Sequence, residues 1–426
     1  MTAPTARWSH WYTVVVLCAA AVLISYIDRT NISVASIAMQ QEFGWNETTK
    51  GYVLSAFFVG YMVLMAASGA LANRFGGRIV LGAAVLWWSA FTMLTPPAAY
   101  LSLPVLIATR IALGLGEAAV FPASINMVGR WVPPASRTKA VAFFTSGLSI
   151  GTVVSLPVTG WLVRAFGWPV PFYVFGALGI VWAAYWFAKV RPGRAFDGTG
   201  AAIEPAGAAI ASGGTPARAA ARRAIPWRAL LTTPAVWAIV VAHFCSNWSL
   251  YVLLAWLPTY FSRTFGVSLA NAGLLSAAPW LAYFVMGNVG GAWADRMMKA
   301  GRSATFVRKF MQITALVGAS GFLLLLPLAG SAAMGMAIMF GACGTLALCL
   351  AGFAANPFDV APRHADVVWG IANTAGTLPG IVGVAVTGWL VDRTGNFNAP
   401  LLLTALVGGV GIVVYAAMGS GERKVD

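Results

Sequence analysis

The sequence predicts an all-α membrane protein, with twelve transmembrane helices arranged as two six-helix bundles related by a pseudo-two-fold axis. Three observations support this fold class. First, only 9% of the 426 residues are charged and 59% are hydrophobic, whereas a soluble domain carries about 25% charged residues. Second, twelve apolar runs are long enough to cross a bilayer, which takes about 20 residues. Third, a long polar segment and an internal repeat divide these runs into two sets of six.

Each apolar run is expected to form one membrane-spanning helix, and the mean hydropathy of +0.78 agrees with so many spans. The first run follows Arg7 and looks like a signal peptide. No small-x-small cleavage site follows it, so we expect an uncleaved first helix. The runs lie at 12–35, 51–72, 79–95, 103–127, 139–163, 170–190, 232–258, 270–293, 306–327, 332–355, 366–390 and 400–419.

The distribution of basic residues sets the expected topology. With a cytoplasmic N-terminus, the inner loops and tails hold 21 of the 27 Lys and Arg residues, and the outer loops hold only Lys50, Arg164, Arg263 and Arg393. This positive-inside bias places both termini in the cytoplasm. The net charge of +15 therefore reports topology, and we expect no nucleic-acid partner.

The chain reads as a duplicated set of six helices. Residues 191–228 are rich in Ala, Gly and Pro with scattered Arg, which is typical of a flexible linker. We therefore expect an N-terminal half at 1–190, a cytoplasmic linker, and a C-terminal half at 229–426. The sequence VTGWLV ends both the fifth run and the eleventh run. Such parallel repeats are typical of two transporter halves related by an axis along the membrane normal.

Four charged residues, Asp28, Arg29, Arg110 and Glu117, lie inside apolar runs. A charge near the bilayer centre costs at least about 2.5–3.5 kcal/mol on insertion scales. These groups should therefore pair with one another, line a water-filled cavity or bind a charged ligand. Arg110 and Glu117 are seven residues apart, about 10 Å along one helix face, and can face a common cavity. Asp28 and Arg29 are adjacent and must point in different directions.

These residue types suit the binding of an anion and its coupling to protons. A guanidinium offers a planar fork of donors that matches a carboxylate or phosphate, so Arg29 and Arg110 in one cavity would form an anion site. Burial favours the protonated form of a carboxyl, which suits Asp28 and Glu117 to proton uptake and release. The alternative interpretation is that the four charges form two salt bridges that only hold helices together.

Short motifs at the cytoplasmic ends of the helices resemble the major facilitator superfamily. GALANRFGGR follows the second run and includes Asn73 and Arg74, and GAWADR follows the eighth and includes Asp295 and Arg296. The superfamily pattern is Gly-x-Leu-Ala-Asp-Arg-x-Gly-x-Arg. Asn73 replaces its Asp, so the charge lock credited to this loop should be weakened in the first half. The resemblance implies a gating or structural role for these four residues.

A narrower resemblance is to the anion:cation symporter family, through YIDRTNISVA and RIALGLGEAAVFPA in the first half. In the second half, NVGGAWADRMMKAGRSATFVRKFMQ and NPFDVAPRHADVVWGIANTAGTLPG look like the plastid anion transporters of that family. The resemblance implies that Arg29 binds substrate and that Asp28 and Glu117 couple protons. It also places three polar groups in the cavity wall: Tyr26, Tyr61 and Asn373.

Other polar residues have weaker signals. Asn247 and Trp256 are minor cavity candidates. His243 is expected to be an inert packed histidine, and the alternative is a polar role near the cavity. Asp359 and Arg363, near the cytoplasmic end of the tenth run, favour a gate or a structural pair over ligand contact. The four cysteines and three histidines have no metal-ligand spacing, so no metal and no cofactor are expected.

The sequence thus predicts a secondary transporter that works by proton-coupled symport of a small organic anion, such as a sugar acid or other carboxylate. The partners expected are that anion, protons and the lipid bilayer, for a monomer in a bacterial inner membrane. One alternative is a sodium- or proton-coupled phosphate transporter, with sodium as the possible coupling ion. Another is a receptor built on a transporter scaffold. The chain lacks a Gly-x-x-x-x-Gly-Lys-Ser/Thr loop and any catalytic constellation, so it is not expected to be an enzyme.

Overall fold

The computed structural model describes residues 10–190, 195–196, 202–203 and 225–425. The N-terminal half contains α1 (His10–Phe43), α2 (Glu47–Phe75), α3 (Gly77–Leu101), α4 (Leu103–Glu117), α5 (Val120–Trp131), η1 (Pro134–Ser136), α6 (Arg137–Phe166) and α7 (Pro169–Lys189). The C-terminal half contains α9 (Trp227–Thr232), α10 (Pro234–Phe265), α11 (Leu269–Lys299), α12 (Ala304–Leu325), η2 (Leu326–Leu328), α13 (Ala332–Leu346), η3 (Ala347–Leu350), α14 (Pro357–Val360), α15 (Ala365–Thr394) and α16 (Asn398–Met418).

Twelve stretches of the described chain are long and apolar enough to cross a membrane, six before and six after the predicted linker. The fourth consists of α4 and α5, and the tenth consists of α13 and η3. The twelve predicted spans are therefore confirmed. Most of the predicted linker lies outside the described residues, as do Arg7, Arg222 and Arg223. Within it, β1 (Ala195–Phe196) and β2 (Ala202–Ile203) form a two-residue antiparallel pair, and α9 begins before the predicted start of the C-terminal half.

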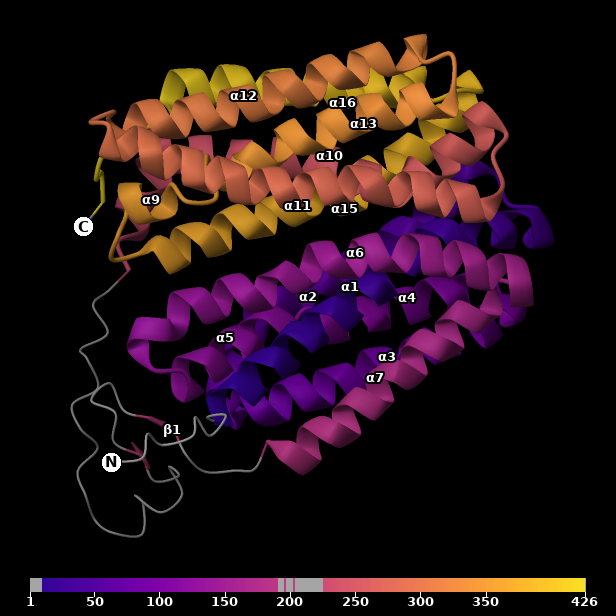
Figure 1. The fold of residues 1–426 in the computed structure, drawn as a ribbon, viewed down its shortest axis with the longest axis horizontal. Coiled ribbons are helices and arrows are strands. Elements are labelled where there is room, and N and C mark those ends of the chain that lie inside the picture. The colour runs from indigo at the N-terminus through magenta and orange to yellow at the C-terminus, as the bar shows by residue number, and fades with distance from the viewer. Residues whose placement is uncertain (1–9, 191–194, 197–201, 204–224, 426) are drawn as a thin grey trace, which may run out of the picture.

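The two halves form separate bundles that lie side by side, with the helix axes running in roughly the same direction (Figure 1). Inside the first bundle, α1 packs on α6 and α3 packs on α7, and in the second bundle α10 packs on α15 and α12 packs on α16. Across the interface, α2 packs on α15 and α11 packs on α6. The same pairs of positions thus meet in both halves, as a pseudo-two-fold repeat requires.

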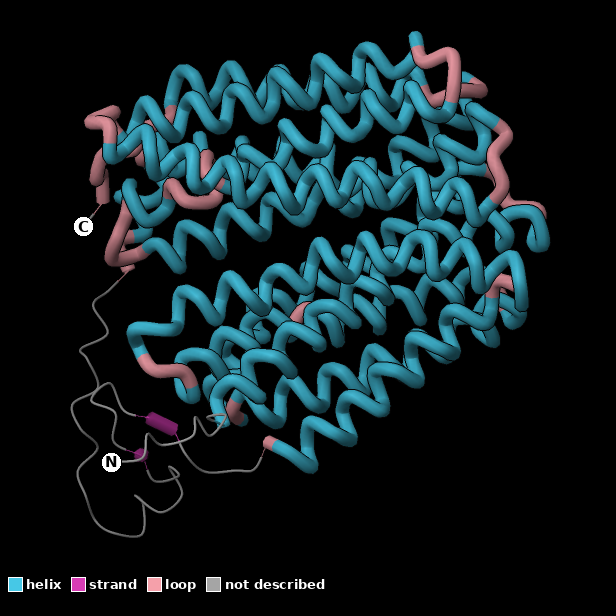
Figure 2. Tube along the Cα trace, viewed as in Figure 1, coloured by secondary structure: helices cyan, strands magenta, loops and turns pink. Residues whose placement is uncertain are grey.

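The fourth and tenth spans are interrupted at equivalent places. The fourth span breaks between Glu117, the last residue of α4, and Val120, the first of α5. The tenth span changes from α13 to the 3-10 helix η3 after Leu346, and the tube drawing shows how few loops otherwise interrupt the helices (Figure 2). Non-helical backbone at membrane depth is tolerated only where protein or a water-filled cavity surrounds it. These breaks are therefore expected to face the protein interior or a water-filled cavity.

Glycines allow α2 and α4 to approach closely. A Cβ atom added to Gly114 would lie 2.0 Å from the carbonyl oxygen of Phe57, and one added to Gly60 would lie 1.9 Å from the carbonyl oxygen of Ile111. Large apolar side chains such as Val181 and Val413 instead face outward, with 66% and 68% of their surface exposed. Small residues between helices and apolar residues outside are the pattern expected in lipid.

Candidate functional site

A cavity of about 1060 Å³ lies between the two halves. The N-terminal half contributes polar groups from α1 and α2, and the C-terminal half contributes others from α10, α11 and α15. The cavity reaches Trp227 of α9 and Val367 at the start of α15, which lie at the cytoplasmic end in the predicted topology. The polar side chains in its wall include Tyr26, Arg29, Tyr61, His243, Asn247, Tyr251, Tyr283, Asn288 and Asn373.

Arg29 forms an ion pair with Glu117 beside this cavity. Both the Nη2 and Nε atoms of Arg29 donate to one carboxylate oxygen of Glu117, at 3.0 and 3.3 Å. The Ser25 hydroxyl donates to the same oxygen at 2.8 Å. The side chain of Arg29 is 3% exposed and that of Glu117 is fully buried. Arg29 thus connects a carboxyl group in the protein interior to the cavity surface.

Three aromatic rings surround the Arg29 guanidinium. Its central carbon lies 4.6, 4.7 and 4.8 Å from the ring centres of Tyr26, Phe57 and Tyr61. Its Nη1 atom also donates to the Tyr26 hydroxyl at 3.4 Å. Cation–π contacts stabilise a cation that has lost its water. Tyr26 and Tyr61 also line the cavity, the position that the family resemblance implied. Their rings pack against Arg29.

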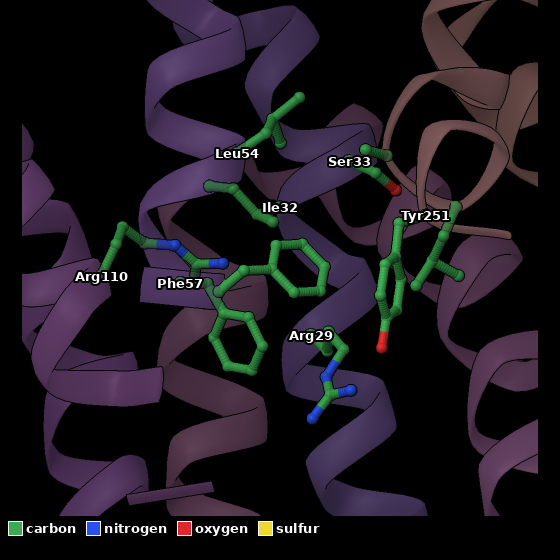
Figure 3. Close-up of a pocket in the computed structure, with 10 residues that line it drawn as sticks. Arg29, Ile32, Ser33, Leu54, Phe57, Arg110 and Tyr251 are labelled. Carbon is green, nitrogen blue, oxygen red and sulfur yellow. The ribbon is translucent and has the colours of Figure 1, made fainter. Parts of the chain in front are cut away.

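Arg110 lies on the other side of Phe57, with its guanidinium carbon 5.8 Å from that ring centre. Figure 3 shows Phe57 between Arg110 and Arg29, both of which line a small pocket next to the main cavity. Neither Arg110 nor Glu117 lines the main cavity, so the expectation that both face it was wrong. Phe57 covers Arg110, and Arg29 covers Glu117. Helix periodicity predicts which residues share a face of a helix, but it does not predict which side chains pack against that face.

Asp28 points away from Arg29 into the interior of the N-terminal half, as expected for adjacent helix positions. Its carboxyl group is fully buried. Neither oxygen has a hydrogen bond of ordinary length within the described part of the chain. The polar groups around it are the Trp88 indole, the Thr92 hydroxyl and the Arg110 guanidinium. Asp28 does not line the main cavity, so it does not contact a molecule bound there directly.

The C-terminal half supplies side-chain amides and an imidazole to the cavity wall. Asn373 donates from Nδ2 to the sulfur of Met65 at 3.0 Å across the interface, and Asn247 donates to the carbonyl oxygen of Gly376 at 2.7 Å. Trp256 is buried and donates to the Val384 carbonyl oxygen at 3.0 Å, so this minor candidate is a packing residue. His243 is buried against Phe353 and Trp369 and also lines the cavity, so its position agrees with both the packed and the cavity interpretation.

A cluster of charges joins the two halves on the predicted outer side, and no pattern in the sequence predicted it. Glu47 at the start of α2 accepts from Arg263 of the other half at 2.8 Å and pairs with Lys50 at 3.0 Å. The carboxylate of Asp392 in α15 accepts from the backbone N–H groups of Glu47 and Thr48, at 2.9 and 2.6 Å. We call Glu47, Lys50, Arg263 and Asp392 the outer latch, because they join the halves on the predicted outer side.

The cytoplasmic motif residues lie outside the main cavity. The Asn73 side chain accepts from the Asn126 amide at 2.9 Å, so an uncharged contact occupies the place of the usual charge lock. Arg74 stacks over the neighbouring Phe75 ring, and Asp295 and Arg296 are exposed near the end of α11.

Asp359, near the cytoplasmic end of the tenth span, pairs with a different residue from the expected Arg363. Asp359 forms its ion pair with Arg308 of α12 at 2.6 Å, whereas Arg363 is exposed. Arg308 also donates to the Ala351 carbonyl oxygen at 2.9 Å. Asp359 therefore links α14 to α12, and it is a structural residue of the C-terminal half.

Twelve spans, two repeated bundles and a central cavity with a buried ion pair define a membrane transporter. Residues 18–384 match the model of the Major Facilitator Superfamily, and the chain belongs to that superfamily. It is a transporter and not an enzyme. The described part of the chain also contains no group of three or more metal-ligating side chains.

Similar proteins are anion transporters of plastids, as the second half of the sequence suggested. The chain is 38% identical to "Probable anion transporter 4, chloroplastic" of Oryza sativa subsp. japonica, over 99% of this chain and 70% of that protein. It is 37% identical to "Sodium-dependent phosphate transport protein 1, chloroplastic" and to "Ascorbate transporter, chloroplastic", both of Arabidopsis thaliana. Those matches cover 99% of this chain and 80% and 76% of the relatives.

A solved structure has the same fold at low sequence identity. A bacterial homolog of the human lysosomal transporter Spinster, in an inward-facing and unoccupied conformation, superposes with a TM-score of 0.79 at 16% identity over 97% of each chain. The protein is thus an integral, multi-pass membrane protein. The relatives' names are chloroplastic, and they give no support to the predicted bacterial inner membrane.

Proposed function

We propose that the protein carries a small organic anion across the membrane by proton-coupled symport, with Arg29 binding the anion. The observation that carries this proposal is the ion pair between Arg29 and Glu117, 3.0 Å long, at the wall of the main cavity. Arg29 is the cationic residue of that wall among the described residues. A carboxylate entering the cavity would find there a planar donor fork that fits it.

The shared contact gives a physical reason for coupling. While Glu117 is ionised, it neutralises Arg29 and competes with any anion for the Nη2 and Nε donors. Protonation of Glu117 removes that competition and leaves Arg29 with an uncompensated charge in a low-dielectric site, where an anion is attracted strongly. Binding of a proton and binding of an anion therefore favour each other, which is the thermodynamic requirement for symport.

The rest of the cavity favours an organic anion. Its wall combines aromatic rings with uncharged amides, hydroxyls and an imidazole, which suit a molecule with one charged end and a neutral body. The name of one relative, an ascorbate transporter, is consistent with this substrate class. Arg110 is a second candidate for anion contact, and reaching it would require Phe57 to move.

The second candidate function is sodium-coupled transport of inorganic phosphate. The observation in its favour is the 37% identity to a protein named as a sodium-dependent phosphate transporter. The same Arg29 could bind a phosphate oxyanion. The two functions differ in the size of the substrate and in the gradient that drives uptake.

Uptake into proteoliposomes containing the purified protein tests the proposal. Radiolabelled carboxylates and phosphate are offered while a pH gradient and a sodium gradient are imposed separately. Accumulation of a carboxylate that follows the pH gradient is the expected result. Accumulation of phosphate that follows the sodium gradient supports the second candidate, and uptake that ignores both gradients contradicts symport.

A further inference from the structure

The VTGWLV repeat places a glycine at the same point of each half, Gly160 in α6 and Gly388 in α15. A Cβ atom added to Gly160 would lie 2.8 Å from the carbonyl oxygen of Leu269, the first residue of α11. A Cβ atom added to Gly388 would lie 2.3 Å from the carbonyl oxygen of Glu47, the first residue of α2. Each repeat glycine therefore touches the backbone of the opposite half.

The partner helices return the contact in the same way. Gly273 lies one turn into α11, and its added Cβ atom would lie 2.3 Å from the carbonyl oxygen of Leu156 in α6. Gly51 lies one turn into α2, and its added Cβ atom would lie 3.3 Å from the carbonyl oxygen of Val384 in α15. Two equivalent seams thus join the halves, and Figure 1 shows α6 facing α11 at the boundary. We call them the α6–α11 seam and the α2–α15 seam.

Both seams lie on the predicted outer side, away from the cytoplasmic end that the cavity reaches. Lys50 and Arg164, two of the basic residues expected in outer loops, lie within about one turn of the seam glycines. The outer latch lies at the α2–α15 seam, where Asp392 accepts from the backbone of Glu47. In the described part of the chain no ion pair joins α6 to α11. The α6–α11 seam is therefore closed by packing and not by charge.

We propose that the repeat glycines form an uncharged outer gate, in which the contacts of Gly160 and Gly388 across the seams set the balance between the inward-open and outward-open states. Alternating access requires the outer ends of the two halves to separate, so these contacts exist only while the outer side is closed. A methyl group at a seam would then destabilise the closed state alone and shift the population toward the outward-open state. The gate does not depend on which anion or coupling ion is carried, so it goes beyond the proposed function.

Maleimide labelling of the full chain in detergent, without substrate, tests the gate in Gly160→Ala and Gly388→Ala. A cysteine in place of the buried Leu54 reports opening of the outer side. A cysteine in place of Thr374, which is exposed in the cavity wall, reports access from the cytoplasmic side. The four native cysteines are buried. We expect each variant to raise the labelling rate at position 54 about 5- to 100-fold, the effect of one methyl group too many in a tight contact. The rate at position 374 should stay the same or fall.

Two further alanine variants are controls. Gly176→Ala introduces a similar clash, 2.9 Å from the carbonyl oxygen of Ser89, but both residues belong to the N-terminal half. It should lower the melting temperature and leave the rate at position 54 unchanged, because opening does not relieve its clash. Gly409→Ala, whose added Cβ atom would meet nothing within 4 Å, should change neither rate.

An unchanged rate at position 54 in Gly160→Ala would overturn the gate, and so would faster labelling at both reporter positions, which means a loosened fold. If Gly160→Ala does not fold, Gly273→Ala at the same seam gives the same comparison. Ionic strength separates the gate from the outer latch, since salt screens exposed charges and not packing. The effect of Gly160→Ala should persist at high ionic strength, and its loss there would assign the closure to the latch charges instead.

Discussion

The outer latch should hold the two halves together on the outer side, and its loss should expose the site from that side. Asp392 is the residue to change, because its two oxygens accept from backbone N–H groups at the first turn of α2, in the opposite half. A carboxylate that caps a helix N-terminus contributes about 0.5–2 kcal/mol. Because Asp392 is exposed, screening limits this gain, and we take about 0.5–1 kcal/mol for Asp392→Ala. That free energy corresponds to a shift of about 2- to 5-fold toward the outward-open state.

Thiol labelling measures this shift. The four native cysteines are buried, so a cysteine in place of Leu54, which is 3% exposed below the latch, reports opening on the outer side. A membrane-impermeant maleimide should label it about 2- to 5-fold faster when Asp392 is Ala. Glu422→Ala, at an exposed carboxylate of the C-terminal segment, is the control and should leave the rate unchanged. An unchanged rate in the Asp392 variant would refute the latch.

Three further predictions follow from the site and the helix packing. Arg29→Lys should lower anion affinity more than about tenfold in equilibrium binding, since an ammonium cannot offer a planar fork; wild-type affinity would remove Arg29 from the site. Gly114→Ala should destabilise the protein by about 1–3 kcal/mol, seen as a lower melting temperature in detergent, because its Cβ would lie 2.0 Å from the Phe57 carbonyl oxygen; an unchanged melting temperature would contradict this close packing. Asn73→Asp should keep the acceptor for Asn126 and support wild-type uptake or better, and a loss of uptake would mean that the uncharged contact is required.

Much of the fold could be predicted from the sequence, because lipid makes length and hydropathy decisive. A run of about 20 apolar residues has few alternatives to a spanning helix, and the repeated VTGWLV required equivalent positions in two halves. The helix breaks after Glu117 and Leu346 were not predicted. They depend on the backbone being buried in protein at those points, which composition does not report.

The candidate site was predictable in its residue types and less so in its arrangement. Charges in apolar runs marked Arg29 and Glu117, yet their mutual pairing required α1 and α4 to be placed in space. The same limit explains Arg110, which helix periodicity placed near the cavity and which Phe57 covers. The outer latch joins Glu47 to Asp392, 345 residues apart in the chain, and no local pattern links them.

The central claim is that Arg29 and Glu117 couple an anion to a proton, and Glu117→Gln tests it most directly. Glutamine keeps the shape and an acceptor for Arg29 but cannot bind or release a proton. In proteoliposomes with an imposed pH gradient, this variant should lose accumulation of the carboxylate while still exchanging labelled for unlabelled carboxylate across the membrane. Glu422→Gln should behave as the wild type. Accumulation driven by the pH gradient in Glu117→Gln would contradict the account.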